Sequence, residues 1–223
     1  MRLLKKVLLA AALLGASVAA MASPSDPKLG VEYTVLPTPQ NTESGKKIEV
    51  TEFFAYYCPH CNAFEPELEA WVKKQGDNIS FKRVHVQLND AVAPQQRLYF
   101  TLEALGLVEQ YHRKVFNAMH VEHNRLNTDA AVLDFATKQG IDPKKFSATY
   151  RSFGVDAKIR RANAMMESYQ VSFWPMIAID GRYVTSPSQA DQGGKAAKNE
   201  AEMGAEALTV MDILVAKAKA EKK

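Results

Sequence analysis

Residues 52–61 read Glu52-Phe53-Phe54-Ala55-Tyr56-Tyr57-Cys58-Pro59-His60-Cys61, a run that joins an apolar segment to two closely spaced cysteines. The wider segment 47–57 is dense in β-branched and aromatic residues, which is typical of a buried central strand. From Asn62 to Lys74, apolar residues recur at helical spacing. The cysteine pair is therefore predicted to lie where a strand passes into a helix, and Pro66 is expected to kink that helix.

Working outward, strands are predicted at 31–36 and 79–88 and again at 176–179 and 182–185, the last two joined by an Asp180-Gly181 hairpin turn. Residues 186–199 are expected to form a polar loop and 201–219 a closing helix. Between 91 and 170 only helical patterns occur, with breaks expected at Gly106, 124–127, 140–143 and Gly154. This order predicts an α/β protein with a thioredoxin-like fold and an inserted all-helical domain, in which 23–90 and 171–223 form the thioredoxin-like domain and 91–170 the insert.

The first residues have the composition of an export signal. Arg2, Lys5 and Lys6 give a basic start, residues 7–14 are an unbroken apolar run, and Ala20-Met21-Ala22 fits the small-x-small rule for signal peptidase. We predict a signal peptide over 1–22 with cleavage after Ala22, and cleavage after Ala20 as the alternative. The apolar run is well short of the roughly 20 residues that a spanning helix needs, so a membrane anchor is disfavoured.

Removal of residues 1–22 changes the charge balance. The whole chain has 28 basic and 25 acidic residues, and the leader holds three of the basic ones and no acidic one, which leaves 25 of each. A mature chain without net charge gives no indication of the basic face that a nucleic-acid partner requires. The mature 201 residues are enough for a sizeable core without disulfide staples, and a disulfide across so short a loop would add little stability. We therefore expect the two cysteines to take part in a reaction rather than to stabilise the fold.

The position of Cys58 favours a reactive thiolate. Unpaired N–H groups of the first helical turn and the helix dipole both stabilise negative charge on its sulfur. Pro59 suits that turn because its missing N–H would have no helical partner, and His60 is expected to donate a hydrogen bond or to place a positive charge beside the sulfur. Cys61, one turn deeper, is predicted to be the resolving thiol. A stabilised thiolate favours the reduced protein, so its disulfide should be oxidising.

Other uses of the two cysteines fit less well. A structural zinc site commonly needs further Cys or His ligands, and His85, His112, His120 and His123 repeat no convincing ligand spacing. His120 and His123 are expected to be solvated. Covalent haem attachment requires His directly after the second cysteine, where this chain has Asn62. We therefore expect neither a metal nor a cofactor.

The run 52–61 resembles the active-site strand and turn of the DsbA family of periplasmic dithiol oxidases, and the order of elements is similar along nearly the whole mature chain. The resemblance implies that Cys58 is the nucleophile and Cys61 the resolving cysteine. It also implies that Glu52 is an acid buried under the active site, which agrees with the cost of placing an acid in an apolar strand without a function. We expect Glu52 to relay protons to Cys61, and the alternative is that it simply ends the strand at a wet edge. Pro175 would be the cis-proline that faces the cysteines and aligns the substrate backbone.

Trp174 departs from the family pattern, which usually has Val or Thr before that proline. The indole is interpreted either as a substrate-binding platform that narrows the groove or as core packing. Met165, Met166 and Tyr169 share a helical face and are expected to belong to the core of the insert rather than to a groove for unfolded chains.

The main hypothesis is a monomeric, periplasmic thiol-disulfide oxidoreductase of a Gram-negative bacterium that donates the Cys58–Cys61 disulfide to newly exported proteins through a mixed disulfide at Cys58. The resemblance implies reduced, unfolded exported proteins as substrates and a membrane quinone-linked reoxidase of the DsbB type as partner. Two alternatives remain: a disulfide isomerase or reductase, and a chaperone-like binding module whose activity does not need the cysteines.

Overall fold

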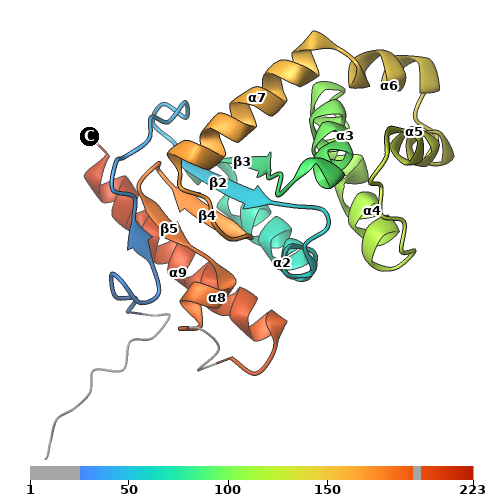
Figure 1. Ribbon diagram of the computed structural model, residues 1–223. Helices are drawn as coiled ribbons and strands as arrows, with labels where there is room; N and C mark the ends of the chain where they lie inside the picture. Colours follow the sequence, from blue (N-terminus) through green and yellow to red (C-terminus); the bar gives the residue numbers. More distant parts are fainter. Residues whose placement is uncertain (1–25, 193–196, 223) are drawn as a thin grey trace, which may run out of the picture.

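The computed structural model describes residues 26–192 and 197–222, and its centre is one mixed five-stranded sheet (Figure 1). The strand order across the sheet is β1-β5-β4-β2-β3. β2 and β3 pair in parallel, whereas β4 runs antiparallel to both β2 and β5, and β1 runs antiparallel to β5. The strands are β1 (Thr34–Val35), β2 (Ile48–Phe54), β3 (Ile79–His85), β4 (Met176–Ile179) and β5 (Tyr183–Thr185).

The two faces of the sheet are covered by different helices. Alternate residues of β4 show this division, because Ile177 and Ile179 pack with α2 (Pro59–Gln75) and α9 (Glu200–Glu221), while Met176 and Ala178 pack with the helical insert. In Figure 1, α2 and α9 lie together on one side of the strands, and α7 (Phe153–Ser168) crosses the other side. β2 lies between β4 and β3 and is buried along its whole length, as predicted.

Residues 90–168 are helical, with no strand in this part of the described chain. Breaks occur at Gly106, near 124–127 and at 140–142, as predicted, but the predicted break at Gly154 is wrong. Ser152 caps the last helix by accepting a bond from the Val155 N–H (3.2 Å), so Gly154 lies within that helix. The elements are η2 (Asp90–Val92), α3 (Ala93–Ala104), α4 (Val108–His120), α5 (Asp129–Lys138), α6 (Pro143–Tyr150) and α7 (Phe153–Ser168).

Several predicted boundaries needed correction. β2 ends at Phe54 rather than at residue 57, and α2 begins at Pro59, so a short turn carries Ala55, Tyr56 and Tyr57 to the first cysteine. The predicted loop 186–199 contains a short helix, α8 (Pro187–Ala190), and one 3-10 turn, η1 (Gly76–Asn78), follows α2. The boundaries move because main-chain pairing with β3 and β4, and not side-chain apolarity alone, decides where a strand ends.

Asp180 and Gly181 form the predicted hairpin turn between β4 and β5, both with positive φ (50° and 65°). The predicted signal peptide, 1–22, lies outside the described residues. In the part of the chain that is described, no helix has the length and apolar character needed to cross a membrane.

Candidate active site

Cys58 lies at the N-cap of α2, immediately after the turn that leaves β2. Its sulfur accepts a hydrogen bond from the backbone N–H of Cys61 (3.3 Å), and as a thiol it donates to the carbonyl oxygen of Trp174 (3.6 Å). Pro59 occupies the first turn of the helix, as predicted, so it removes no helical hydrogen bond. The sulfur thus stands between a helix N-terminus and the loop before β4.

The two cysteines, both free thiols here, have opposite electrostatic environments. The pKa of Cys58 is lowered to about 7 by a hydrogen bond from the Cys61 side chain, by the backbone N–H groups of Cys61 and His60, and by the charge of His60, against the opposing effect of burial. Burial raises the pKa of Cys61 well above its usual range, and the Cys58 and Glu52 charges add to this. Only Cys58 retains exposure, 4% against 0% for Cys61. The pair therefore combines a stabilised thiolate with a buried thiol.

The imidazole of His60 does not bond the sulfur, contrary to one of the two roles predicted for it. Its Nδ1 lies 2.8 Å from Glu200 Oε1, at the start of α9. The contribution of His60 to Cys58 comes through its backbone N–H and its charge. Glu200 had no signal in the sequence, because it is 140 residues away from its partner.

Trp174 and Pro175 form the loop opposite the cysteines, joined by a cis peptide bond. The Trp174 ring is half-buried and makes an edge contact with Tyr57 (centroids 6.1 Å apart), while its carbonyl oxygen faces Cys58. The sequence left two interpretations of Trp174, a substrate-binding platform and core packing. Each describes part of its position, because the ring packs against the core and also lines a groove.

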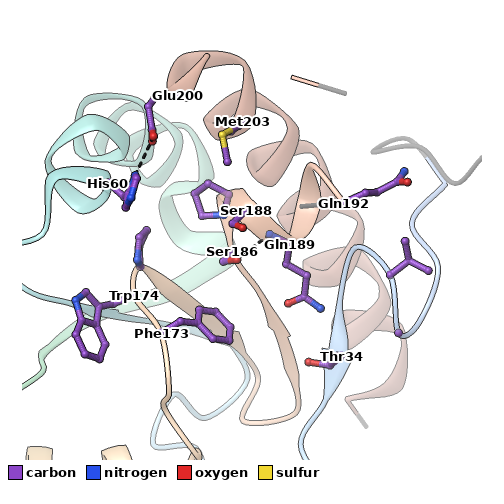
Figure 2. A pocket seen from close by; sticks show the side chains of 14 residues that line it. Thr34, His60, Phe173, Trp174, Ser186, Ser188, Gln189, Gln192, Glu200 and Met203 are labelled. Atoms are coloured by element: carbon purple, nitrogen blue, oxygen red, sulfur yellow. Dashed lines mark hydrogen bonds and ion pairs between the residues drawn. The ribbon is translucent and has the colours of Figure 1, made fainter. Parts of the chain in front are cut away.

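That groove has a volume of about 670 Å³ and runs beside the N-terminus of α2 (Figure 2). His60, Phe173, Trp174 and Glu200 surround its end near the cysteines, and residues of β1, α8 and α9 form the rest. Phe173 lines this groove with 42% of its surface exposed. The wall is mainly apolar, with neutral polar groups and the His60–Glu200 pair, a composition suited to an extended polypeptide.

Glu52 is buried below the cysteines, as predicted, and is part of an ion cluster that was not predicted. Arg83 of β3 donates from Nε to Glu52 Oε2 (2.9 Å) and from Nη2 to Glu65 Oε1 (2.6 Å). Burial raises the pKa of Glu52 to about 8 and that of Glu65 to about 7, although Arg83 opposes both shifts. Glu65 stands four residues after Cys61 on the buried side of α2, and this spacing was the signal that the sequence offered.

His85, His112 and His120 lie around Tyr56, in the turn before Cys58. His112 Nδ1 and the Tyr56 hydroxyl share a hydrogen bond (2.9 Å), and His85 Nε2 accepts from the Tyr56 backbone N–H (3.1 Å). His120, expected to be solvated, instead donates from Nε2 to the Tyr56 carbonyl (2.8 Å), whereas His123 is exposed. Three histidines thus hold the turn before Cys58.

Tyr169 is buried with its ring 5.0 Å from that of Phe53, and Met165 and Met166 pack against the same core. The prediction of a core position is confirmed for Tyr169, whereas Met165 and Met166 are half-buried at the margin of that core.

Comparison with known proteins matches this geometry to a family. A model described as a DSBA-like thioredoxin domain matches residues 49–193. The chain belongs to this family. Thiol:disulfide interchange protein DsbA of Burkholderia cepacia is 41% identical over 187 residues, covering 82% of this chain and 88% of the relative. The protein of the same name from Bordetella pertussis is 39% identical over 181 residues, covering 81% and 85%.

Solved structures agree. The crystal structure of Pseudomonas aeruginosa DsbA has a TM-score of 0.80 and 31% identity, covering 90% of this chain and 98% of that one. The Xylella fastidiosa DsbA structure has a TM-score of 0.76 at 25% identity, covering 87% and 98%. The DsbA-like thioredoxin fold is therefore confirmed, and the DsbA-family chain with its Cys58–Cys61 pair is a thiol-disulfide oxidoreductase that acts in oxidative protein folding.

Proposed function

We propose that the oxidised chain donates its Cys58–Cys61 disulfide to reduced, unfolded exported proteins. The observation that carries this proposal is the asymmetry of the two thiols, one with a lowered pKa at a helix N-cap and one buried with a raised pKa. An environment that stabilises the thiolate favours the reduced form and makes the disulfide a good oxidant.

The exchange takes two steps. A substrate thiolate attacks Cys58 Sγ, forms a mixed disulfide and breaks the bond to Cys61, which leaves as a thiolate and takes up a proton. A second substrate thiolate then attacks the substrate sulfur of the mixed disulfide and releases Cys58 as a thiolate. The substrate loses two electrons and the enzyme gains them as two reduced cysteines.

The surrounding residues have proposed roles in these steps. Glu52 is fully buried and mostly protonated at neutral pH, and one of its carboxyl oxygens has no hydrogen-bond partner in the described chain, which suits proton transfer to and from Cys61. Trp174 and Pro175 face Cys58 and line the groove, so we assign them to the binding of the substrate backbone. The carbonyl of Trp174 already accepts a bond from the sulfur that would carry the mixed disulfide.

The setting of the reaction is also a proposal. Cleavage after Ala22 would release the chain into the periplasm of a Gram-negative cell as a monomer, where a quinone-linked membrane reoxidase of the DsbB type would restore the disulfide. The family supports an action on exported proteins, and the reoxidase follows from the need to remove two electrons after each turnover.

A trapping experiment tests the proposed function. Cys61→Ala whose Cys58 has first been converted to a mixed disulfide with glutathione should release glutathione to a reduced substrate protein and form a mixed disulfide with it through Cys58. The Cys58→Ala, Cys61→Ala double variant should lose oxidase activity completely. A chaperone-like module would keep its activity in the double variant. In glutathione buffers, a midpoint potential clearly above about −180 mV supports a disulfide donor, and one near about −270 mV would identify a reductase instead.

The relay is tested separately. Glu52→Gln should slow the attack of a substrate thiolate on the oxidised pair, because Cys61 leaves in that step and receives its proton through Glu52. In the Cys61→Ala background, exchange of a mixed disulfide at Cys58 should not depend on Glu52. Unchanged exchange rates together with an unchanged midpoint would contradict the relay.

A further inference from the structure

The imidazole of His60 pairs with Glu200 and not with the sulfur of Cys58. Its Nδ1 and Glu200 Oε1 are 2.8 Å apart, with 61% and 46% of the two side chains exposed. Figure 2 shows the two residues joined across the end of the groove, above Trp174. An interaction between two partly exposed groups stabilises a fold little, so stability is a poor reason for this pair.

The packing of α2 against α9 explains why the two residues meet. Gly204, one turn after Glu200, lies so close to α2 that a Cβ there would be 3.2 Å from the ring of Phe64, one turn after His60, and 2.5 Å from Glu67 Oε2. Further along, Trp71 Nε1 donates to Asp212 Oδ1 (2.8 Å). The helices therefore run side by side in the same direction, in a register that places Glu200 over His60.

The position of the ring matters for the nearby sulfur. Titratable side chains that act on Cys58 electrostatically are Cys61 and His60 of α2 and, from the preceding turn, Tyr57. Of these, only His60 brings a cation, and its charge lowers the pKa of Cys58 less than the hydrogen bonds from Cys61 and from the His60 backbone do. A carboxylate bonded to Nδ1 occupies a donor that would otherwise be available to the sulfur and offsets the charge of the ring.

We propose that Glu200 is a positioning residue that holds His60 toward the groove and thereby limits how strongly the imidazole stabilises the Cys58 thiolate. Glu200 thus sets the oxidising strength of the disulfide through His60. The inference goes beyond the proposed function and rests on Cys58 being the reactive thiol.

The test is a double-mutant cycle on the mature chain with Glu200→Ala, His60→Ala and the double variant. The pKa of Cys58 is measured from thiolate absorbance near about 240 nm as a function of pH, and the equilibrium with glutathione is measured in parallel. Glu200→Ala should lower that pKa and shift the equilibrium toward the reduced enzyme by about threefold or more, which corresponds to about half a pKa unit. In the His60→Ala background, the same substitution should have no effect on either quantity.

Glu202→Gln is the matched control. Glu202 also lies in the first turn of α9 but accepts from the backbone N–H of Lys198, so its loss removes a nearby charge without touching His60. It should leave the pKa of Cys58 unchanged. An equal shift in this control, an equal effect of Glu200→Ala with and without His60, or no shift at all would overturn the inference.

Two spectroscopic measurements distinguish loss of the His60–Glu200 contact from a change in the fold. The ¹⁵N chemical shifts of the His60 ring should report loss of the Nδ1 contact in Glu200→Ala, while far-UV circular dichroism stays the same. The outcome is separable from the proposed function, because the pKa of Cys58 can be measured even in a protein that forms no mixed disulfide with a substrate, and that failure would count against the function alone.

Discussion

At the scale of residues, the chemistry of the pair depends on a difference of about one helical turn in depth. Cys58 stands where N–H groups of α2 have no helical acceptor, while Cys61 is enclosed and lies near the negative field of Glu52. The same covalent motif thus contains one thiol that ionises readily and one that resists ionisation. This difference suits a disulfide donor. A substrate thiolate attacks Cys58, and Cys61, which leaves in that step, is protonated within the protein.

The lowered pKa of Cys58 predicts a pH-dependent stability of the reduced protein. Because the folded state lowers this pKa from 9.0 to about 7, folding is favoured by ionisation of Cys58, fully above about pH 9, and this contribution is lost as pH falls through about 7. Reduced wild type should therefore gain stability over Cys58→Ser between about pH 6 and 8.5. Urea unfolding at both pH values checks this, and a constant difference between the two proteins would contradict it.

Glu52 predicts a trend of the opposite sign. Burial raises the pKa of this acid from 4.5 to about 8, so its contribution to folding is complete below about pH 4.5 and is lost as pH rises through about 8. Glu52→Gln resembles the protonated form and should become more stable than wild type as pH rises from about 5 to 8. Unfolding of both proteins in the oxidised state measures this without interference from the thiols.

Arg83 keeps Glu65 as its partner in that variant, so the substitution does not leave an unpaired buried cation. A relative stability that falls with pH would show that the Arg83–Glu52 attraction outweighs the cost of burying the charge.

At the scale of elements, the strands that build the site are positioned by their turns. The hairpin between β4 and β5 sets the direction of β4, whose start carries the Trp174-Pro175 loop toward the cysteines. Gly181 is fixed in this turn by the bond from the Gln40 N–H to its carbonyl (2.8 Å). An added Cβ at Gly181 would lie 2.2 Å from the Gln40 carbonyl oxygen, so no side chain fits without movement of the backbone.

We predict that Gly181→Ala lowers the free energy of unfolding by about 2 kcal/mol or more, because it combines a left-handed backbone with a main-chain clash. Gly45→Ala is the control. Gly45 has a similar φ of 59° but nothing within 4 Å of an added Cβ, so its substitution should cost about 1 kcal/mol. Urea unfolding measures the free energy of unfolding of both variants. Equal losses in the two would contradict the prediction, because they would show that the backbone at Gln40 moves away from the added Cβ without loss of stability.

At the scale of the whole molecule, the sheet and the insert share one core. Phe53 and Phe54 of β2 pack in the same cluster as Leu98 and Phe116 of the insert. Gln96 adds a polar tie, since its Nε2 donates to the His85 carbonyl (2.8 Å) and to Asn163 Oδ1 (3.0 Å). The division into a thioredoxin-like domain (23–90 and 171–223) and an insert (91–170) stays a prediction. Because the two parts share one core, we expect neither to be stable without the other.

We predict that the two parts unfold together. Far-UV circular dichroism, to which the helices of both parts contribute, and the fluorescence of Trp71 and Trp174, which lie outside the insert, should give the same urea midpoint. The fragment 91–170 alone should not fold, because it would expose the residues that face β2. Two separate midpoints would show that the insert has an independent core.

Local patterns in the sequence were sufficient for β4, the Asp180-Gly181 turn, the helical character of 91–168 and the cysteine pair at a strand-to-helix junction. Each depends on neighbours within a few residues, through periodicity, turn chemistry or the free N–H groups of a helix start. The burial of Glu52 could also be inferred, since this acid lies within a largely apolar strand.

The contacts that adjust the site were decided only by tertiary structure. Arg83 reaches Glu52 because β3 pairs in parallel with β2, and Glu200 reaches His60 because α9 packs along α2. These pairs are 31 and 140 residues apart, and no periodicity links them. The sequence determined which atoms react, whereas the packing of distant elements decided the charges around them, because electrostatic interactions depend on distance in space and on burial rather than on separation along the chain.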